Sequence, residues 1–188
     1  MIFAAVLALR PWAAEILYVW FHKLGPSDWW GGNEHVDSML RRRFAREWAM
    51  LSVRPPGEFT GDAQMALAAV LLFDQVPRNI FRDDPRAYAT DGLARMICNS
   101  AFDQGYDRAL TGPQAQFLAM PLMHSEDIID QRRALRVFAH VDGGSAFSHA
   151  RSHHRMIAHF GRFPHRNEVL GRTSTEAEQR AIEAGFAW

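Results

Sequence analysis

The stretch DAQMALAAVLLFDQVPRN at residues 62–79 decides the fold of this chain. Its apolar side chains cover nearly every side of a helix, namely those of Met65, Leu67, Val70, Leu71, Leu72 and Phe73. A helix that is apolar all round is buried in the centre of a protein. Asp62 suits the N-cap position, and Pro77 lacks the N–H that a helix interior needs. We therefore predict a central helix from Ala63 to about Gln75 that ends before Pro77.

The remaining segments are also patterned for helices, since no run shows the period-two alternation of a half-buried strand. The predicted helices cover residues 11–24, 38–51, 85–105, 112–118, 126–141 and 147–160, followed by a last helix capped within residues 173–175. Asp37, Asp84 and Ser125 are the expected N-caps of three of them, and Trp29 and Trp30 are expected in a turn. We predict an all-α protein whose residues 1–188 form a single helical domain.

The composition of the chain indicates which classes of binding partner to expect. The chain has 188 residues, of which 48% are hydrophobic and 22% charged, values typical of a globular domain. Its 21 basic and 21 acidic residues cancel, so there is no net field to attract nucleic acid. No stretch reaches the roughly 20 apolar residues of a membrane span. We expect no nucleic-acid partner and no membrane span.

The first residues form an apolar N-terminal extension over residues 1–10, which is either helical or a remnant of a targeting signal. It resembles the core of a signal peptide but lacks a basic start and runs directly into Arg10 and Pro11. The single cysteine, Cys98, cannot form an intrachain disulfide and lies among apolar neighbours. We therefore predict a cytoplasmic protein.

Polar motifs interrupt the apolar helices at residues 74–79, 121–127 and 160–167. Asp74 is expected near a helix C-terminus, where a carboxylate is unfavourable unless a cation such as Arg78 or Arg166 answers it. The predicted ligand-binding residues are Asp74, Arg78, Asn79, Arg162, His165, Arg166 and Asn167. We predict that these residues, Asn79 aside, converge with His124, Glu126 and Asp127 on one concave polar site, because separate burial would leave charges unpaired. The competing interpretation is that the two Arg-Asn pairs, Arg78-Asn79 and Arg166-Asn167, donate hydrogen bonds to the free carbonyls at helix ends.

The segment His124-Ser125-Glu126-Asp127 contains the candidate catalytic residues, which are His124, Glu126 and Asp127. A helix start exposes free N–H groups that attract anions, and a histidine titrates near neutrality. Glu126 or Asp127 would orient His124 or act as the base. The alternative is ordinary capping, in which Ser125 caps the helix and the two acids meet its dipole.

Two histidines, His149 and His153, are one helical turn apart, which is a spacing that metal sites use. They are weak candidates because no glutamate lies within the motif and inward histidines are commonly hydrogen-bonded in the core. We expect no metal and no cofactor.

Three functions from different classes remain open. A binding protein would use Arg78, Arg162 and Arg166 to hold a small anionic ligand, either a carboxylate or a phosphate. A hydrolase would use His124 or His153 with a carboxylate as general base and an arginine to stabilise the oxyanion. A structural protein would use the same charges as a buried ion-pair network in an interaction scaffold, with a protein partner bound through the helical surface.

At these motifs the chain resembles a known bacterial family. The segments 72–79, 121–127 with Gln131, and 159–167 continuing through 170–174 look like those of the family known as domain of unknown function 924 (DUF924). The resemblance covers nearly the whole chain and implies an all-helical, tetratricopeptide-like fold of antiparallel helix pairs. It implies no established activity.

Overall fold

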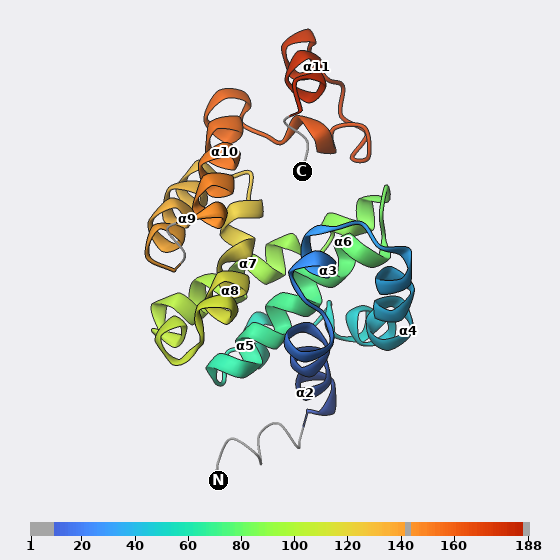
Figure 1. Cartoon of the computed structure of the whole chain (residues 1–188), viewed down its shortest axis with the longest axis vertical. Coiled ribbons are helices and arrows are strands. Elements are labelled where there is room, and N and C mark those ends of the chain that lie inside the picture. The colour runs from blue at the N-terminus through green and yellow to red at the C-terminus, as the bar shows by residue number, and fades with distance from the viewer. Residues whose placement is uncertain (1–9, 142–143, 186–188) are drawn as a thin grey trace.

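The computed structural model describes residues 10–141 and 144–185, and these residues form helices and turns without a strand (Figure 1). The α-helices are α2 (Pro11–Tyr18), α3 (Pro26–Trp30), α4 (Glu34–Leu51), α5 (Ala63–Val70), α6 (Val76–Ile80), α7 (Asp91–Asp103), α8 (Gly112–His124), α9 (Ile128–Val141), α10 (Ser145–Phe160) and α11 (Glu176–Glu183). The all-α prediction is confirmed. The N-terminal extension lies outside the described residues apart from Arg10.

Short π and 3-10 turns join these helices. The π turns are η1 (Val19–Lys23) and η3 (Leu71–Gln75), and the 3-10 turns are η2 (Pro56–Phe59), η4 (Pro85–Tyr88), η5 (Tyr106–Ala109) and η6 (Pro164–Arg166). Helix α9 packs against both α8 and α10. This packing is compatible with helix pairs, and the tetratricopeptide-like arrangement stays a prediction.

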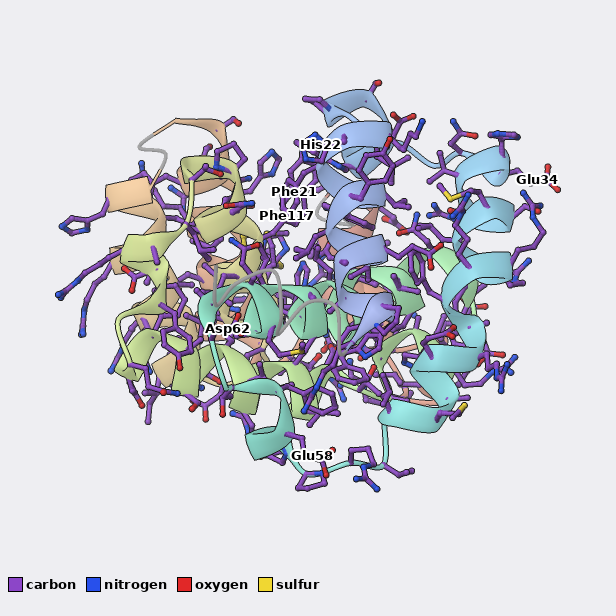
Figure 2. The ribbon with its side chains drawn as sticks, turned by 90° about the horizontal axis from the view of Figure 1, so that it is seen from below. Phe21, His22, Glu34, Glu58, Asp62 and Phe117 are labelled. Carbon is purple, nitrogen blue, oxygen red and sulfur yellow. The ribbon has the colours of Figure 1, made fainter. Side chains whose placement is uncertain are left out.

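Helix α5 lies in the centre of the molecule, as its apolar sequence predicts. It packs against α2, α7 and α8, and its residues from Ala66 to Val70 are fully buried. Asp62 caps it by accepting a hydrogen bond of 2.9 Å from the backbone N–H of Met65. From below, α2 crosses over α5, with Phe21 directed toward Phe117 of α8 at a ring separation of 5.8 Å (Figure 2).

The helical run does not end before Pro77, which corrects the sequence prediction. The π turn η3 follows α5 directly, and α6 then begins at Val76 with Pro77 in its first turn. Proline is tolerated in that position because the first N–H groups of a helix have no partner inside it. Thr90 donates a hydrogen bond of 2.6 Å to the carbonyl of Phe73 in the π turn. Asp74 is therefore held inside a continuous run rather than at a free helix end.

Several predicted boundaries near the N-terminus are wrong. Asn33, not Asp37, caps α4, because its side chain accepts the backbone N–H of His35. Asp37 lies one turn inside the helix, where it pairs with Arg82. Trp29 and Trp30 belong to the short helix α3 instead of a turn.

Further boundaries shift in the second half of the chain. Asp84 caps only the 3-10 turn η4, and α7 begins later, at Asp91. Helix α8 is longer than predicted and continues to His124, so that α9 begins at Ile128. Helix α10 begins two residues earlier than predicted and ends at Phe160 as predicted. Gly161 follows it with a φ of 71°, a left-handed conformation that glycine adopts without strain.

Two predictions about the ends and the solvent exposure of the chain can be compared with the structure. The last helix, α11, has the predicted cap, since Thr175 accepts the N–H of Glu178 and Glu178 accepts that of Thr175. Cys98 is fully buried. Within the described part of the chain, none of the helices has the length and apolar character needed to cross a bilayer.

Candidate functional site

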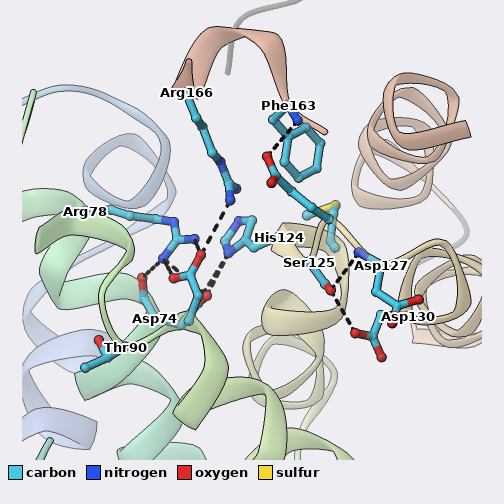
Figure 3. Close-up of polar contacts among 12 residues, drawn as sticks. Asp74, Arg78, Thr90, His124, Ser125, Asp127, Asp130, Phe163 and Arg166 are labelled. Atoms are coloured by element: carbon cyan, nitrogen blue, oxygen red, sulfur yellow. Dashed lines mark hydrogen bonds and ion pairs between the residues drawn. The ribbon is translucent and has the colours of Figure 1, made fainter. Parts of the chain in front are cut away.

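The centre of the candidate site is the carboxylate of Asp74, whose side chain is only 1% exposed. Arg78 lies 3.3 Å from one of its oxygens, and the Nδ1 atom of His124 lies 2.9 Å from both (Figure 3). Gln75 donates a further hydrogen bond of 2.6 Å. Burial by itself raises the pKa of Asp74, but Arg78 and His124 outweigh it and hold the pKa at about 2. The carboxylate is therefore ionised at neutral pH.

His124 lies at the end of α8 with 12% of its side chain exposed. Burial lowers the pKa of the imidazole, and the nearby charge of Asp74 only partly opposes this. The ring is therefore neutral at pH 7, and the carboxylate at Nδ1 assigns the proton to that nitrogen. Among the described residues, the hydrogen bonds of the ring are made by Nδ1 and none by Nε2. This nitrogen can accept a proton or a hydrogen bond from a ligand.

Arg78 joins Asp74 to a second carboxylate. Its two terminal nitrogens each donate to Asp91 over 2.9 Å, and it also donates to the backbone carbonyl of Asp74. Its guanidinium lies 5.6 Å from the ring of Tyr88. Both terminal nitrogens of Arg78 are therefore engaged with protein acceptors.

Arg166 reaches the same place from η6, and its side chain is 7% exposed (Figure 3). Its guanidinium lies between the rings of Phe163 and Tyr88, at 4.4 and 4.7 Å. The carboxylate of Asp91 is 3.5 Å away, and the buried Nε has no hydrogen-bond partner. Burial and the charge of Arg78 lower the pKa of Arg166 to about 10. Arg166 therefore remains a cation at pH 7, but the acceptors around it give it only one long contact with a carboxylate and none at Nε.

Two more histidines surround this group. The ring of His153 is 6.4 Å from that of His124 and 5.3 Å from that of Phe163. Burial lowers the pKa of His153 to about 3, and burial together with Arg166 lowers the pKa of His165 to about 4. Both rings are therefore neutral at pH 7. They add polar ring nitrogens to the site without adding charge.

Glu126, a predicted catalytic residue, is turned away from His124. Its oxygens accept two hydrogen bonds from Arg172, of 2.7 and 3.0 Å, and one of 2.8 Å from the backbone N–H of Phe163. Burial by itself raises the pKa of Glu126, but the hydrogen bonds from Arg172 and Phe163 outweigh burial, and the pKa is lower than usual. The carboxylate that orients His124 is that of Asp74, not Glu126.

Asp127, the other predicted catalytic acid, lies on the far side of Ser125 from Asp74 (Figure 3). It is 46% exposed, and its side chain accepts the N–H of Ile129 at the start of α9. Its nearest cation is Arg95, at 3.8 Å. Asp127 therefore caps α9, which corrects the prediction that Ser125 is the N-cap. The Ser125 hydroxyl instead accepts the N–H of Asp127 and donates to Asp130.

Three predicted ligand-binding residues also lie apart from Asp74. Arg162 forms an ion pair with Glu178, and Asn167 donates to Ser174. Asn79 donates 2.8 Å to Asp37, which belongs to a separate ion pair with Arg82. The structure therefore brings together Asp74, Arg78, His124, His165 and Arg166, and it leaves Asn79, Asp127, Arg162 and Asn167 in other contacts.

The two candidate metal ligands do not face one point. His149 is exposed, whereas His153 is buried and its Nδ1 lies 2.9 Å from the backbone carbonyl of His149. Within residues 10–141 and 144–185, no three acidic, histidine or cysteine side chains are grouped as metal ligands would be.

Two open hollows lie elsewhere on the molecule. One has a volume of about 370 Å³ beside Trp12 and Phe59, and the other about 300 Å³ beside Val19 and Met39. Neither is lined by a residue of the Asp74 site. The concave entrance that the sequence predicts over this site remains a prediction.

Two residues of the site, Asp91 and Tyr88, lie outside the polar motifs and carry no local signal in the sequence. The motifs themselves contain three further residues of the site, Gln75, Phe163 and Arg172, so their position in the sequence could have identified them.

Comparisons with known proteins agree with the fold but name no activity. A family model described as "Bacterial protein of unknown function (DUF924)" matches residues 16–185. A solved structure, described as that of a protein of unknown function, ATU0120, from Agrobacterium tumefaciens, is 36% identical with a TM-score of 0.87. The match covers 92% of this chain and 97% of that one. No curated protein matches the chain.

Proposed function

We propose that this chain, which belongs to the DUF924 family of bacterial proteins, binds a small phosphate or carboxylate anion beside Arg166 and His124. The observation that supports this most directly is the poor matching of Arg166. Its side chain is 7% exposed, yet its nearest carboxylate is 3.5 Å away and its Nε is unpaired. A buried cation in this condition costs free energy that a bound anion would recover.

The charges around Arg166 favour an anion over a cation. Asp91 accepts its short hydrogen bonds from Arg78, and Asp74 is already held by Arg78 and His124. The rings of Tyr88 and Phe163 cover the faces of the Arg166 guanidinium, so a ligand has to approach its edge. The planar edge of a guanidinium fits two oxygens of a carboxylate or phosphate.

Calorimetric titration of the protein with inorganic phosphate and with acetate tests this proposal, compared with chloride at matched ionic strength. We expect saturable binding in wild type and at least a tenfold loss of affinity in Arg166→Gln, the removal of one charged hydrogen-bond donor being worth about 1.5–3 kcal/mol. Arg180→Gln is the matched control, because Arg180 is 69% exposed and lies in α11. Equal binding by Arg166→Gln and wild type would refute the site.

A second candidate function, hydrolysis, is favoured by the pairing of Asp74 with His124. Asp74 fixes the Nδ1–H form of the ring, which leaves the Nε2 lone pair to remove a proton from water. The hydroxide oxygen would attack the phosphoryl or acyl centre, and the proton would pass from Nε2 to the leaving oxygen. Arg166 would stabilise the developing negative charge.

A screen of phosphate monoesters and carboxylic esters tests for this activity. If hydrolysis occurs, His124→Gln should abolish it while anion binding through Arg166 persists. Activity that survives in His124→Gln would exclude His124 as the base. An ion-pair network with a purely structural role is the competing explanation, and it predicts neither anion binding nor turnover.

We also propose that residues 1–188 act as one cytoplasmic domain, with a protein partner on the helical surface. The main core, which includes residues from Ala13 to Ala150, supports one domain, and the buried thiol of Cys98 suits a reducing compartment. Cell fractionation and affinity capture test the location and the partner.

A further inference from the structure

Arg166 belongs to a loop that lies outside the main core. We call residues 161–175 the Arg166 loop; it leaves α10 at Gly161 and leads to α11, which lies at one end of the molecule (Figure 1). The loop is tied to itself by a hydrogen bond of 2.7 Å from the N–H of Arg172 to the carbonyl of Asn167. Arg172 also donates 3.1 Å to the carbonyl of Phe163. These bonds join its two ends, so it can move as one unit.

One carboxylate of the main helical body holds both ends of this loop. Glu126, from the turn between α8 and α9, accepts the backbone N–H of Phe163 near the start of the loop and both terminal nitrogens of Arg172 near its end. Other contacts also join the loop to the body, since Arg166 lies 4.7 Å from the ring of Tyr88 and Ile128 of α9 packs against the apolar cluster of Phe163. Arg166 is 3.5 Å from Asp91, and the buried ring of Phe163 belongs to a small apolar cluster with Met156 and Ile157 of the adjoining helix α10.

We propose that Glu126 is a positioning residue that holds the Arg166 loop against the Asp74–His124 pair and thereby sets the anion affinity of the site. This inference rests on the proposed anion binding. It replaces the catalytic role that the sequence suggested for Glu126, because both of its oxygens are engaged with the loop. When the bonds to Glu126 break, the loop moves and Arg166 withdraws, which opens a path for the anion. A bound anion closes the loop, because it binds the closed state more tightly than the open one.

The first test measures loop opening by NMR-detected amide hydrogen exchange in the full-length Glu126→Gln protein. The glutamine keeps the size of the side chain but presents an N–H to groups that are themselves donors. We expect the amide of Phe163 to exchange about tenfold faster, since a hydrogen bond to a charged group is lost. The amide of Arg172 should be unchanged, because its acceptor, Asn167, lies within the loop.

Glu168→Gln is the matched control. It makes the same chemical change at an exposed position within the loop. Unchanged exchange at Phe163 in Glu126→Gln would overturn the inference. Equal acceleration at Phe163 and Arg172 would also overturn it, because the loop would then unfold rather than move as a unit.

The second test asks whether Glu126 acts through Arg166. Titration with inorganic phosphate should show about tenfold weaker binding in Glu126→Gln than in wild type and no change in Glu168→Gln. In an Arg166→Gln background, Glu126→Gln should have no further effect, because the residue that it positions is gone. Additive losses would overturn the inference while leaving anion binding intact. If wild type binds no anion, the proposed function has failed, and the exchange rates alone decide whether Glu126 holds the loop.

Discussion

The central run from Asp62 to Ile80 and the Arg166 loop bring charges to the same site by opposite means. In the central run, buried apolar residues flank Asp74 in the π turn η3, which continues the helix α5 that packs against three others. The contacts of the loop include the polar bonds to Glu126 and the buried ring of Phe163, which lies in a small cluster outside the main core. Burial of many apolar groups fixes a position strongly, whereas a few polar bonds contribute about 1 kcal/mol each and can open locally. We therefore expect Asp74 to be fixed and Arg166 to be the part of the site that moves.

The comparison is tested most strongly by Phe73→Ala in the central run. Phe73 is fully buried and packs on Phe59 at 5.1 Å between ring centres. We expect a loss of about 4 kcal/mol in the free energy of unfolding, because the surrounding helices cannot close the cavity. Urea denaturation measures this loss, with Met96→Ala, a residue 50% exposed, as control. A loss no larger than that of the control would show that the run is not the rigid part of the molecule.

Acid titration tests how firmly the run holds Asp74. The pKa of Asp74 is about 2 in the folded protein and 3.8 in the reference state, so its charged form is favoured by folding. Its contribution, about 2 kcal/mol, is fully present above pH 4 and is lost as the pH falls toward 2. Denaturation of wild type and Asp74→Asn between pH 5 and pH 2 isolates it, because other carboxylates titrate in both. Equal acid slopes in the two proteins would contradict the assignment.

Phe163→Ala removes a buried phenyl ring from the Arg166 loop, just as Phe73→Ala removes one from the central run. Both rings are fully buried, so the area lost from the core is matched. We expect a smaller loss, about 1–2 kcal/mol, because the loop can shift to fill the space or open locally instead of leaving a cavity. The same urea experiment measures it. Losses of equal size in the two variants would mean that the loop is as firmly integrated as the core.

The sequence predicts the run better than the loop, for a physical reason. The burial of α5 and the caps at Asp62 and Thr175 follow from local pattern. The sequence also predicts that Asp74 needs a cation, from an expected place at a helix C-terminus. The continuation through Pro77 was missed because a π turn depends on packing around it and leaves no period in the sequence.

The pairings in the site show the same limit. The partner of His124 is Asp74, 50 residues away, and neighbouring Glu126 and Asp127 bind elsewhere. Adjacent residues in a turn point in different directions, so proximity in the sequence gave the wrong carboxylates. No sequence pattern identifies Asp91 as a site residue, although both Arg78 and Arg166 pair with its carboxylate.

Asp91→Asn should have the smallest effect on anion affinity and gives the sharpest distinction between functions. The change keeps the shape of the side chain but removes the one charge that connects Arg78 of the run with Arg166 of the loop. If the site binds anions, a phosphate can replace the missing charge of Asp91. The affinity of the variant for phosphate should then be about fivefold higher than that of wild type, equivalent to about 1 kcal/mol. Added phosphate should then recover most of the lost stability by mass action.

A purely structural network predicts a different result for Asp91→Asn, because two buried arginines would repel one another whether phosphate is present or not. Calorimetric titration and thermal unfolding with and without phosphate separate the two cases. Asp103→Asn is the control, since that carboxylate is 69% exposed and pairs with Arg133 on the surface. Stability that falls in Asp91→Asn and does not respond to phosphate would favour the structural network over the anion site. Recovery by phosphate would instead show that the space between the run and the loop accepts an external negative charge.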